Sequence, residues 1–273
     1  MRSRLEAALD LLKIEERVGI APYITAGDGG LATTLAVLQA LEAGGASVVE
    51  LGIPFSDPIA DGPVLQAAAQ RSLESGTTLL AVLAMVRRYR AQGGSLPLLA
   101  FSYLNPLLAG GLEATTQAMA DAGMDGVLVP DLPVEEAAEL RATCNSARLD
   151  TVFFATPTTS DERIARAAEA SGGFLYVIGR TGVTGAATTL EGDADEYIER
   201  VRAAAGNRPL GVGFGIREAS QVRALQGRAS LAIVGTAMVQ RIHSAVSLAG
   251  SNSDAAKAGA EAAGAYLSEL QQG

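Results

Sequence analysis

The sequence predicts an α/β protein that folds as one (β/α)8 TIM barrel, a single domain over residues 1–273. Eight short apolar runs alternate with segments of helical pattern, and this alternation is typical of a parallel sheet. The runs are apolar almost throughout, as in strands that are covered on both faces. A length of 273 residues with 48% hydrophobic content suits one barrel and its core. The most linker-like stretch, residues 247–254, is read as a loop between two helices.

The expected strands follow one another along the whole chain, at residues 18–26, 46–53, 96–104, 124–132, 150–157, 173–179, 209–215 and 230–237. Helices are expected between and after them, at residues 31–43, 79–92, 112–122, 134–146, 161–171, 194–205 and 217–226. Strand–helix alternation repeated eight times predicts that the sheet closes into a barrel.

Additional helices are expected before the first strand, after the second and after the eighth, at residues 3–13, 64–75, 238–247 and 254–270. Two helix starts carry the pattern of a capping box, in which a hydroxyl and a glutamate three residues later satisfy each other's backbone N–H groups. These pairs are Ser3 with Glu6 and Thr159 with Glu162.

The net charge of −9 argues against a protein whose main surface binds nucleic acid. No apolar run is long enough to cross a membrane, and the amphipathic first ten residues lack the apolar core of a signal peptide. The lone cysteine, Cys144, excludes an intrachain disulfide and fits the reducing cytoplasm, where we expect the protein to act.

Histidine and lysine are scarce, since His243 is the only histidine and Lys13 and Lys257 are the only lysines. A catalytic triad at a strand end is therefore excluded, and no cluster of His or Cys predicts a metal site. A Schiff-base aldolase needs a lysine inside the barrel. Here one lysine precedes the first expected strand and the other follows the last.

Glu50 stands in an expected strand among Val48, Val49, Leu51 and Ile53. Side chains alternate along a strand, so Glu50 shares a face with Val48. We expect this face to line the barrel, because the face under the helices should be the more apolar. Burial raises the pKa of a carboxyl, which suits a proton carrier near neutral pH. The alternative is a structural glutamate that buried hydroxyls or backbone groups satisfy.

Further polar residues stand at the ends of expected strands, where barrels of this kind build their active sites. Asp57 and Asp61 follow the second strand in a proline-rich loop, and Tyr103 and Asn105 stand at the end of the third. Ordinary alternatives exist, because aspartates are common in turns and Tyr103 could simply fill the barrel.

Glycine-rich segments with small hydroxyl residues end the last three expected strands, at residues 179–186, 211–216 and 234–237. Glycines let backbone N–H groups approach an anion, and a helix N-terminus after the eighth strand would add a favourable dipole. Barrels often hold phosphate at this place. Three such segments together favour a phosphate site over glycines that merely make tight turns.

The segment ELGIPFSDPIADGP at residues 50–63 is the most distinctive motif of the chain. Other motifs accompany it in order: PYITAGD (22–28), SYLNP (102–106), GVLVPDLPVEE (126–136), FATPTTSDERI (154–164), GVTGA (182–186) and VGFGI (212–216). Together, over nearly the whole chain, they resemble the tryptophan synthase alpha subunit family.

The resemblance implies a lyase that cleaves indole-3-glycerol phosphate to indole and glyceraldehyde 3-phosphate by a retro-aldol step. It implies that Glu50 is the proton shuttle and Asp61 the second catalytic carboxylate. It places the substrate-binding groups at strand ends, on Tyr103, Thr184, Gly185, Gly213, Gly215, Gly235 and Thr236. No cofactor or metal is expected in this chain, because the indole ring itself takes up the electrons of the broken bond.

The resemblance also implies a beta partner in an α2β2 complex. That partner uses pyridoxal phosphate to join indole to serine, which makes tryptophan. Pro54, Phe55 and Asp57, together with Asn105, resemble the surface that faces the partner. The alternative is that Pro54 and Phe55 pack over the mouth of the barrel.

Three other functions stay open from the sequence: a free-standing indole lyase, a non-catalytic regulatory subunit that binds the same substrate, and another phosphate-binding barrel such as an isomerase. Turnover by the isolated chain would distinguish the free-standing lyase from a partnered subunit. Binding of the substrate without cleavage would indicate the regulatory subunit, although Glu50 and Asp61 argue against it.

Overall fold

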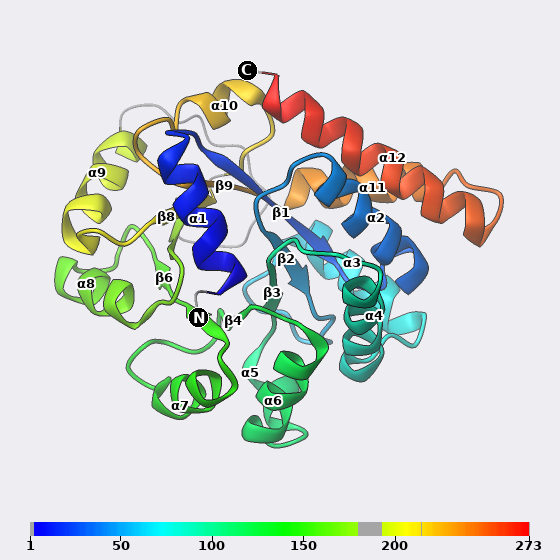
Figure 1. Ribbon diagram of the computed structural model, residues 1–273, viewed down its shortest axis with the longest axis horizontal. Helices are drawn as coiled ribbons and strands as arrows, with labels where there is room; N and C mark the ends of the chain where they lie inside the picture. The colour runs from blue at the N-terminus through cyan, green and yellow to red at the C-terminus, as the bar shows by residue number, and fades with distance from the viewer. Residues whose placement is uncertain (1–2, 180–192, 214, 273) are drawn as a thin grey trace.

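The computed structural model describes residues 3–179, 193–213 and 215–272. Its parallel strands form a sheet in the order β5-β4-β3-β2-β1-β9-β8-β7-β6, which wraps into a barrel (Figure 1). The strands are β1 (Gly19–Thr25), β2 (Val49–Gly52), β3 (Leu98–Phe101), β4 (Gly126–Leu128), β5 (Asp150–Val152), β6 (Phe154–Ala155), β7 (Leu175–Ile178), β8 (Leu210–Gly213) and β9 (Leu231–Val234).

The extra strand arises because the fifth expected strand is divided at Phe153. β5 pairs with β4 and β6 pairs with β7, so the two ends of the sheet order are adjacent in the chain. The carbonyl of Phe153 accepts a hydrogen bond of 2.9 Å from the N–H of Tyr176. The (β/α)8 barrel is therefore confirmed, with its fifth strand bent and shared between two neighbours.

Helices surround the barrel and cover its ends. They are α1 (Arg4–Ile14), α2 (Leu31–Ala43), α3 (Pro63–Glu74), α4 (Leu79–Ala91), α5 (Leu104–Leu108), α6 (Leu112–Ala122), α7 (Ala138–Ala147), α8 (Asp161–Ala170), α9 (Asp193–Ala205), α10 (Ala219–Arg223), α11 (Thr236–Val246) and α12 (Asn252–Gln271). The four additional helices are confirmed as α1, α3, α11 and α12. None of the described helices is long and apolar enough to cross a membrane.

One helix cap and the extents of two helices differ from the prediction. The capping box at Ser3 is confirmed, but α8 is capped by Ser160, while Thr159 accepts a hydrogen bond from the N–H of Thr156 within the preceding turn. The expected helix at 134–146 begins only at Ala138, because the residues after Pro133 form tight turns. The helix expected at 217–226 is shortened to α10.

The short helix α5 was not predicted and replaces the end of the third expected strand. Pro106 lies in its first turn, where a missing N–H costs little. The N–H of Leu104 donates to the carboxylate of Asp131 at 3.0 Å, so an acid from the loop after β4 satisfies the start of this helix. This contact explains why the chain turns away from the sheet just after Tyr103.

Strand side chains alternate between two apolar clusters, one inside the barrel and one under the helices. The interior cluster contains Ala21, Val48, Leu99, Leu128, Val152, Phe174, Leu231 and Ile233. Leu5, Leu9 and Leu12 of α1 complete it, and Figure 1 shows this helix lying across the barrel opening. The amino-terminal end of the barrel is therefore filled, which leaves chemistry to the other end.

Asp125, just before β4, fixes this closed end through a buried ion-pair network. Its carboxylate lies 2.8 Å from both the Arg4 and Arg90 guanidinium groups, and it accepts the N–H of Leu98 at 2.8 Å. The side chain of Asp125 is only 5% exposed and that of Arg90 is 14% exposed, so water replaces their contact poorly, whereas Arg4 is 46% exposed and its contact is weaker.

We expect Asp125→Ala to lower the free energy of unfolding by about 3 kcal/mol, because it leaves the buried Arg90 guanidinium without its carboxylate partner and the Leu98 N–H without its acceptor. Urea unfolding at pH 7 measures this change. Asp121→Ala, at an exposed position on α6, is the control and should change stability by less than about 0.5 kcal/mol. Equal effects of the two substitutions would contradict the role of the network.

Candidate active site

Glu50 lies inside the barrel, as the alternation of its strand predicts. It pairs in register with Tyr23 of β1 and Leu99 of β3, and its neighbours Val49 and Leu51 face the helices. Its side chain is only 1% exposed, and its Oε1 atom has no hydrogen-bond partner among the described residues. Burial raises the pKa of Glu50 to about 8. The carboxyl is therefore held mostly protonated at neutral pH and is free to transfer its proton.

Asp61 is the second buried carboxylate, 5% exposed, in the loop between β2 and α3. Its N–H donates to the carbonyl of Pro58 at 3.0 Å, and its carbonyl accepts from the side-chain amide of Gln66 at 2.9 Å. Burial raises the pKa of the carboxyl to about 6, although a hydrogen bond from Tyr103 lowers it. Asp61 is therefore mostly ionised at neutral pH, in contrast to Glu50.

Tyr103 joins this loop to the end of β3. Its hydroxyl accepts a hydrogen bond of 3.0 Å from the N–H of Ala60 and makes the hydrogen bond to Asp61. The ring is 2% exposed and contacts Phe55, with 5.5 Å between the ring centroids. The structure thus brings Tyr103 and Asp61 together, and Tyr103 helps to hold the loop that carries Asp61.

Two tyrosines that the sequence analysis left aside also line the site. Tyr23 lies over Gly52, where an added Cβ would be 2.1 Å from the hydroxyl, and Tyr176 lies over Gly213 in the same way at 3.0 Å. Burial is the main cause that raises the pKa of both phenols, and the charge of Glu50 adds to it, so these groups share one electrostatic environment. Strand alternation by itself predicts that both tyrosines point into the barrel. They were overlooked because the residues around them in these strands are apolar.

The expected phosphate groups are only partly described. Gly235 is the N-cap of α11, with no side-chain capping bond, and Thr236 is the first residue of the helix. The first N–H groups of this eleven-residue helix therefore have no intrahelical acceptor. Gly215 has a φ of +71°, which suits glycine, whereas Gly213 makes room for Tyr176. Thr184 and Gly185 lie outside the described residues.

The residues expected to face a partner differ in their exposure. Pro54 is buried and Phe55 is half-buried against Tyr103, so both cover the barrel mouth, while Asp57 and Asn105 are exposed. Ile59 of the same loop, which the sequence analysis did not single out, is 74% exposed. Single exposed apolar side chains are common on protein surfaces, so Ile59 is distinguished by its place in the loop that is expected to face a partner.

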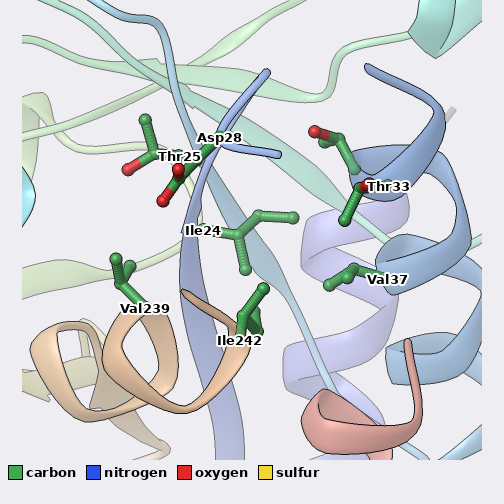
Figure 2. Close-up of a pocket in the computed structure, with 8 residues that line it drawn as sticks. Ile24, Thr25, Asp28, Thr33, Val37, Val239 and Ile242 are labelled. Atoms are coloured by element: carbon green, nitrogen blue, oxygen red, sulfur yellow. The ribbon is translucent and has the colours of Figure 1, made fainter. Parts of the chain in front are cut away.

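Two cavities elsewhere in the structure are lined by neither Glu50 nor Asp61. A cavity of about 10 Å³ beside β1, with room for about one water, lies between α2 and α11 (Figure 2). A groove of about 940 Å³ lies at the closed end, beside α1. No group of three or more His, Cys, Asp or Glu in the described part of the chain could hold a metal ion.

The chain is similar to known proteins over most of its length. A family model described as tryptophan synthase alpha chain matches residues 9–268. Tryptophan synthase alpha chains of Chloroflexus aurantiacus and Marinobacter nauticus are each 44% identical to it over 88% of this chain, covering 90% and 88% of the relatives.

Solved structures agree with these relatives. A tryptophan synthase subunit alpha from Legionella pneumophila matches with a TM-score of 0.85, 31% identity and 99% coverage of both chains. A chain of Mycobacterium tuberculosis tryptophan synthase matches with a TM-score of 0.85, 30% identity and full coverage of both chains. The protein therefore belongs to the tryptophan synthase alpha chain family.

Proposed function

We propose that Glu50 and Asp61 carry out the alpha reaction of this family, in which indole-3-glycerol phosphate is cleaved to indole and glyceraldehyde 3-phosphate. One observation supports this assignment above the others. The open end of the barrel holds two buried carboxyl groups whose environments separate their pKa values, to about 8 for Glu50 and about 6 for Asp61. Such a pair contains an acid and a carboxylate at the same pH, which divides the roles in acid–base catalysis.

The reaction needs a proton at carbon 3 of the indole ring before the carbon–carbon bond can break. Protonated Glu50 donates this proton and forms the indolenine, and its carboxylate then removes the proton of the adjacent glycerol hydroxyl. The bond electrons return to the ring as the aldehyde forms. Asp61 accepts a hydrogen bond from the indole N–H and stabilises the positive charge that develops there.

The chain's remaining groups orient the substrate. The N-terminus of α11 at Gly235 and Thr236 offers the phosphate N–H groups that have no intrahelical acceptor, and Gly215 lets the backbone approach it. We assign Thr184 and Gly185 to the same substrate from the family motif. No cofactor takes part in this step, because the ring accepts the electrons, and pyridoxal phosphate belongs to the beta partner.

Glu50→Gln should abolish indole release, with a loss of about 10²–10⁴-fold in kcat, because the amide cannot shuttle a proton. The fold should be retained, because glutamine keeps the shape of the side chain. The substitution also removes a destabilising effect of Glu50, whose carboxyl ionises above pH 4.5 in the unfolded chain but only near pH 8 in the folded protein. Indole release by purified protein, with and without a beta subunit, measures the effect.

Glu139→Gln, on the exposed face of α7, is the matched control and should leave kcat unchanged. Full activity of Glu50→Gln would exclude Glu50 as the proton carrier. No indole from folded wild-type protein under either condition would refute the lyase function itself. High activity without the partner would instead favour a free-standing lyase.

The pH dependence of kcat/KM should be bell-shaped, with activity lost below about 6, as Asp61 is protonated, and above about 8, as Glu50 loses its proton. In Tyr103→Phe the acidic limb should move to higher pH, because the lost hydrogen bond lowered the pKa of Asp61. The substrate phosphate titrates identically with both enzymes, so the difference isolates Asp61. An unmoved acidic limb would contradict this coupling.

We further propose that the loop around Ile59 binds a beta subunit, in the α2β2 arrangement. Ile59→Asp should weaken that complex by at least about tenfold, because a buried interface carboxylate is costly to desolvate. Leu80→Asp, equally exposed at 74% but on α4, is the control. Titration calorimetry with the beta subunit measures both, and equal affinities of the two variants would exclude this surface. Phe55 is less suitable for the test, because its ring also supports Tyr103.

A further inference from the structure

We propose that the ion pair between Asp28 and Arg71 positions Asp61. The pair anchors α3 to the end of β1, and α3 holds the loop that carries Asp61. This inference rests on the proposed role of Asp61. It assigns to Asp28 and Arg71 no contact with the substrate. They act through the helix that immediately follows the catalytic loop.

The two catalytic carboxyl groups are held by different means. Glu50 lies within β2, where hydrogen bonds to β1 and β3 fix its register. Asp61 lies at the end of a loop without regular structure, nine residues beyond Gly52 and two before α3 begins at Pro63. The distance between the two groups therefore depends on how firmly α3 is attached to the sheet.

Asp61 follows α3 closely because its own carbonyl is bound to that helix. The side-chain amide of Gln66 donates to the Asp61 carbonyl at 2.9 Å, and the backbone N–H of Gln66 donates to Gly62 at 3.0 Å. A shift of the first turn of α3 would therefore carry Asp61 with it. Misplacing a catalytic group by about 1 Å can cost 10²-fold in rate.

The far half of α3 is clamped to the loop that leaves β1. Arg71 donates two hydrogen bonds to Asp28, from Nε to Oδ1 at 2.8 Å and from an Nη to Oδ2 at 2.7 Å. Ser72 adds a hydrogen bond of 2.6 Å to the carbonyl of Ala26. Paired, parallel hydrogen bonds between guanidinium and carboxylate fix orientation as well as distance.

The loop that carries Asp28 is a firm attachment point for α3, because α2 holds its backbone. The N–H of Gly27 donates to the Thr34 hydroxyl at 2.9 Å, and the Thr33 hydroxyl donates to the carbonyl of Gly29 at 2.7 Å. Gly27, Gly29 and Gly30 all have φ between +77° and +94°, which glycine adopts without strain. Gly27 packs so closely on the end of α3 that an added Cβ would lie 2.4 Å from the Ser72 hydroxyl. Asp28 also borders the small cavity of Figure 2, so packing alone does not fill its surroundings.

The test compares Arg71→Gln, Asp28→Asn and the double variant with wild type, in indole release and in amide hydrogen exchange of residues 53–66. Each single variant should lower kcat about tenfold with little change in KM, and the double variant should be no worse than the singles. Arg71→Lys keeps the charge but loses the paired geometry, and it should recover part of kcat. Exchange at residues 53–66 should quicken in Arg71→Gln.

Arg163→Gln is the matched control, because Arg163 also makes two hydrogen bonds to one carboxylate, that of Glu135, at 2.8 and 3.1 Å. It should change neither kcat nor the exchange of residues 53–66. Unchanged exchange in Arg71→Gln would overturn the proposal, as would losses that are additive or confined to KM. Wild-type protein that releases no indole would refute the lyase function, while the exchange measurement would still decide the role of the ion pair.

Discussion

The rest of the candidate site depends on the burial of one carboxyl group, that of Glu50, in the interior of a barrel. Parallel pairing with β1 and β3 leaves this side chain no direction except inward, where Oε1 finds no partner among the described residues. The cost of desolvation is expressed as a raised pKa. Burial of this carboxyl group therefore destabilises the fold and also keeps the acid protonated near neutral pH.

The two ends of the barrel differ in how their polar groups are paired. At the amino end, α1 inserts leucines among the interior residues, and Asp125 gathers two arginines around it. That end contributes rigidity, since its charges are neutralised by fixed partners. At the carboxyl end, the loops after β2 and β3 place Asp61 and Tyr103 at the end of the barrel where Glu50 lies. There the Oε1 atom of Glu50 has no hydrogen-bond partner among the described residues, and strongly shifted pKa values of this kind are typical of functional sites.

Glu50 and Asp61 are held in two different ways. The hydrogen bonds of the sheet fix Glu50, whereas the side chains of Tyr103 and Gln66 bind Asp61. A group held by side chains is sensitive to single substitutions but can also be moved.

The sequence by itself determined the barrel, the four additional helices, and the inward orientation of Glu50, because period-2 alternation and strand–helix order are local properties. The division of the fifth strand at Phe153 and the helix α5 were not predictable in this way. They depend on pairing with β7 and on the Asp131 contact, which join residues distant in sequence. Asp61 was identified by family motif, but only the tertiary structure decided that burial and the Tyr103 hydroxyl set its pKa in opposite directions. The acid–base character of the site arises from such long-range contacts, and no local pattern encodes them.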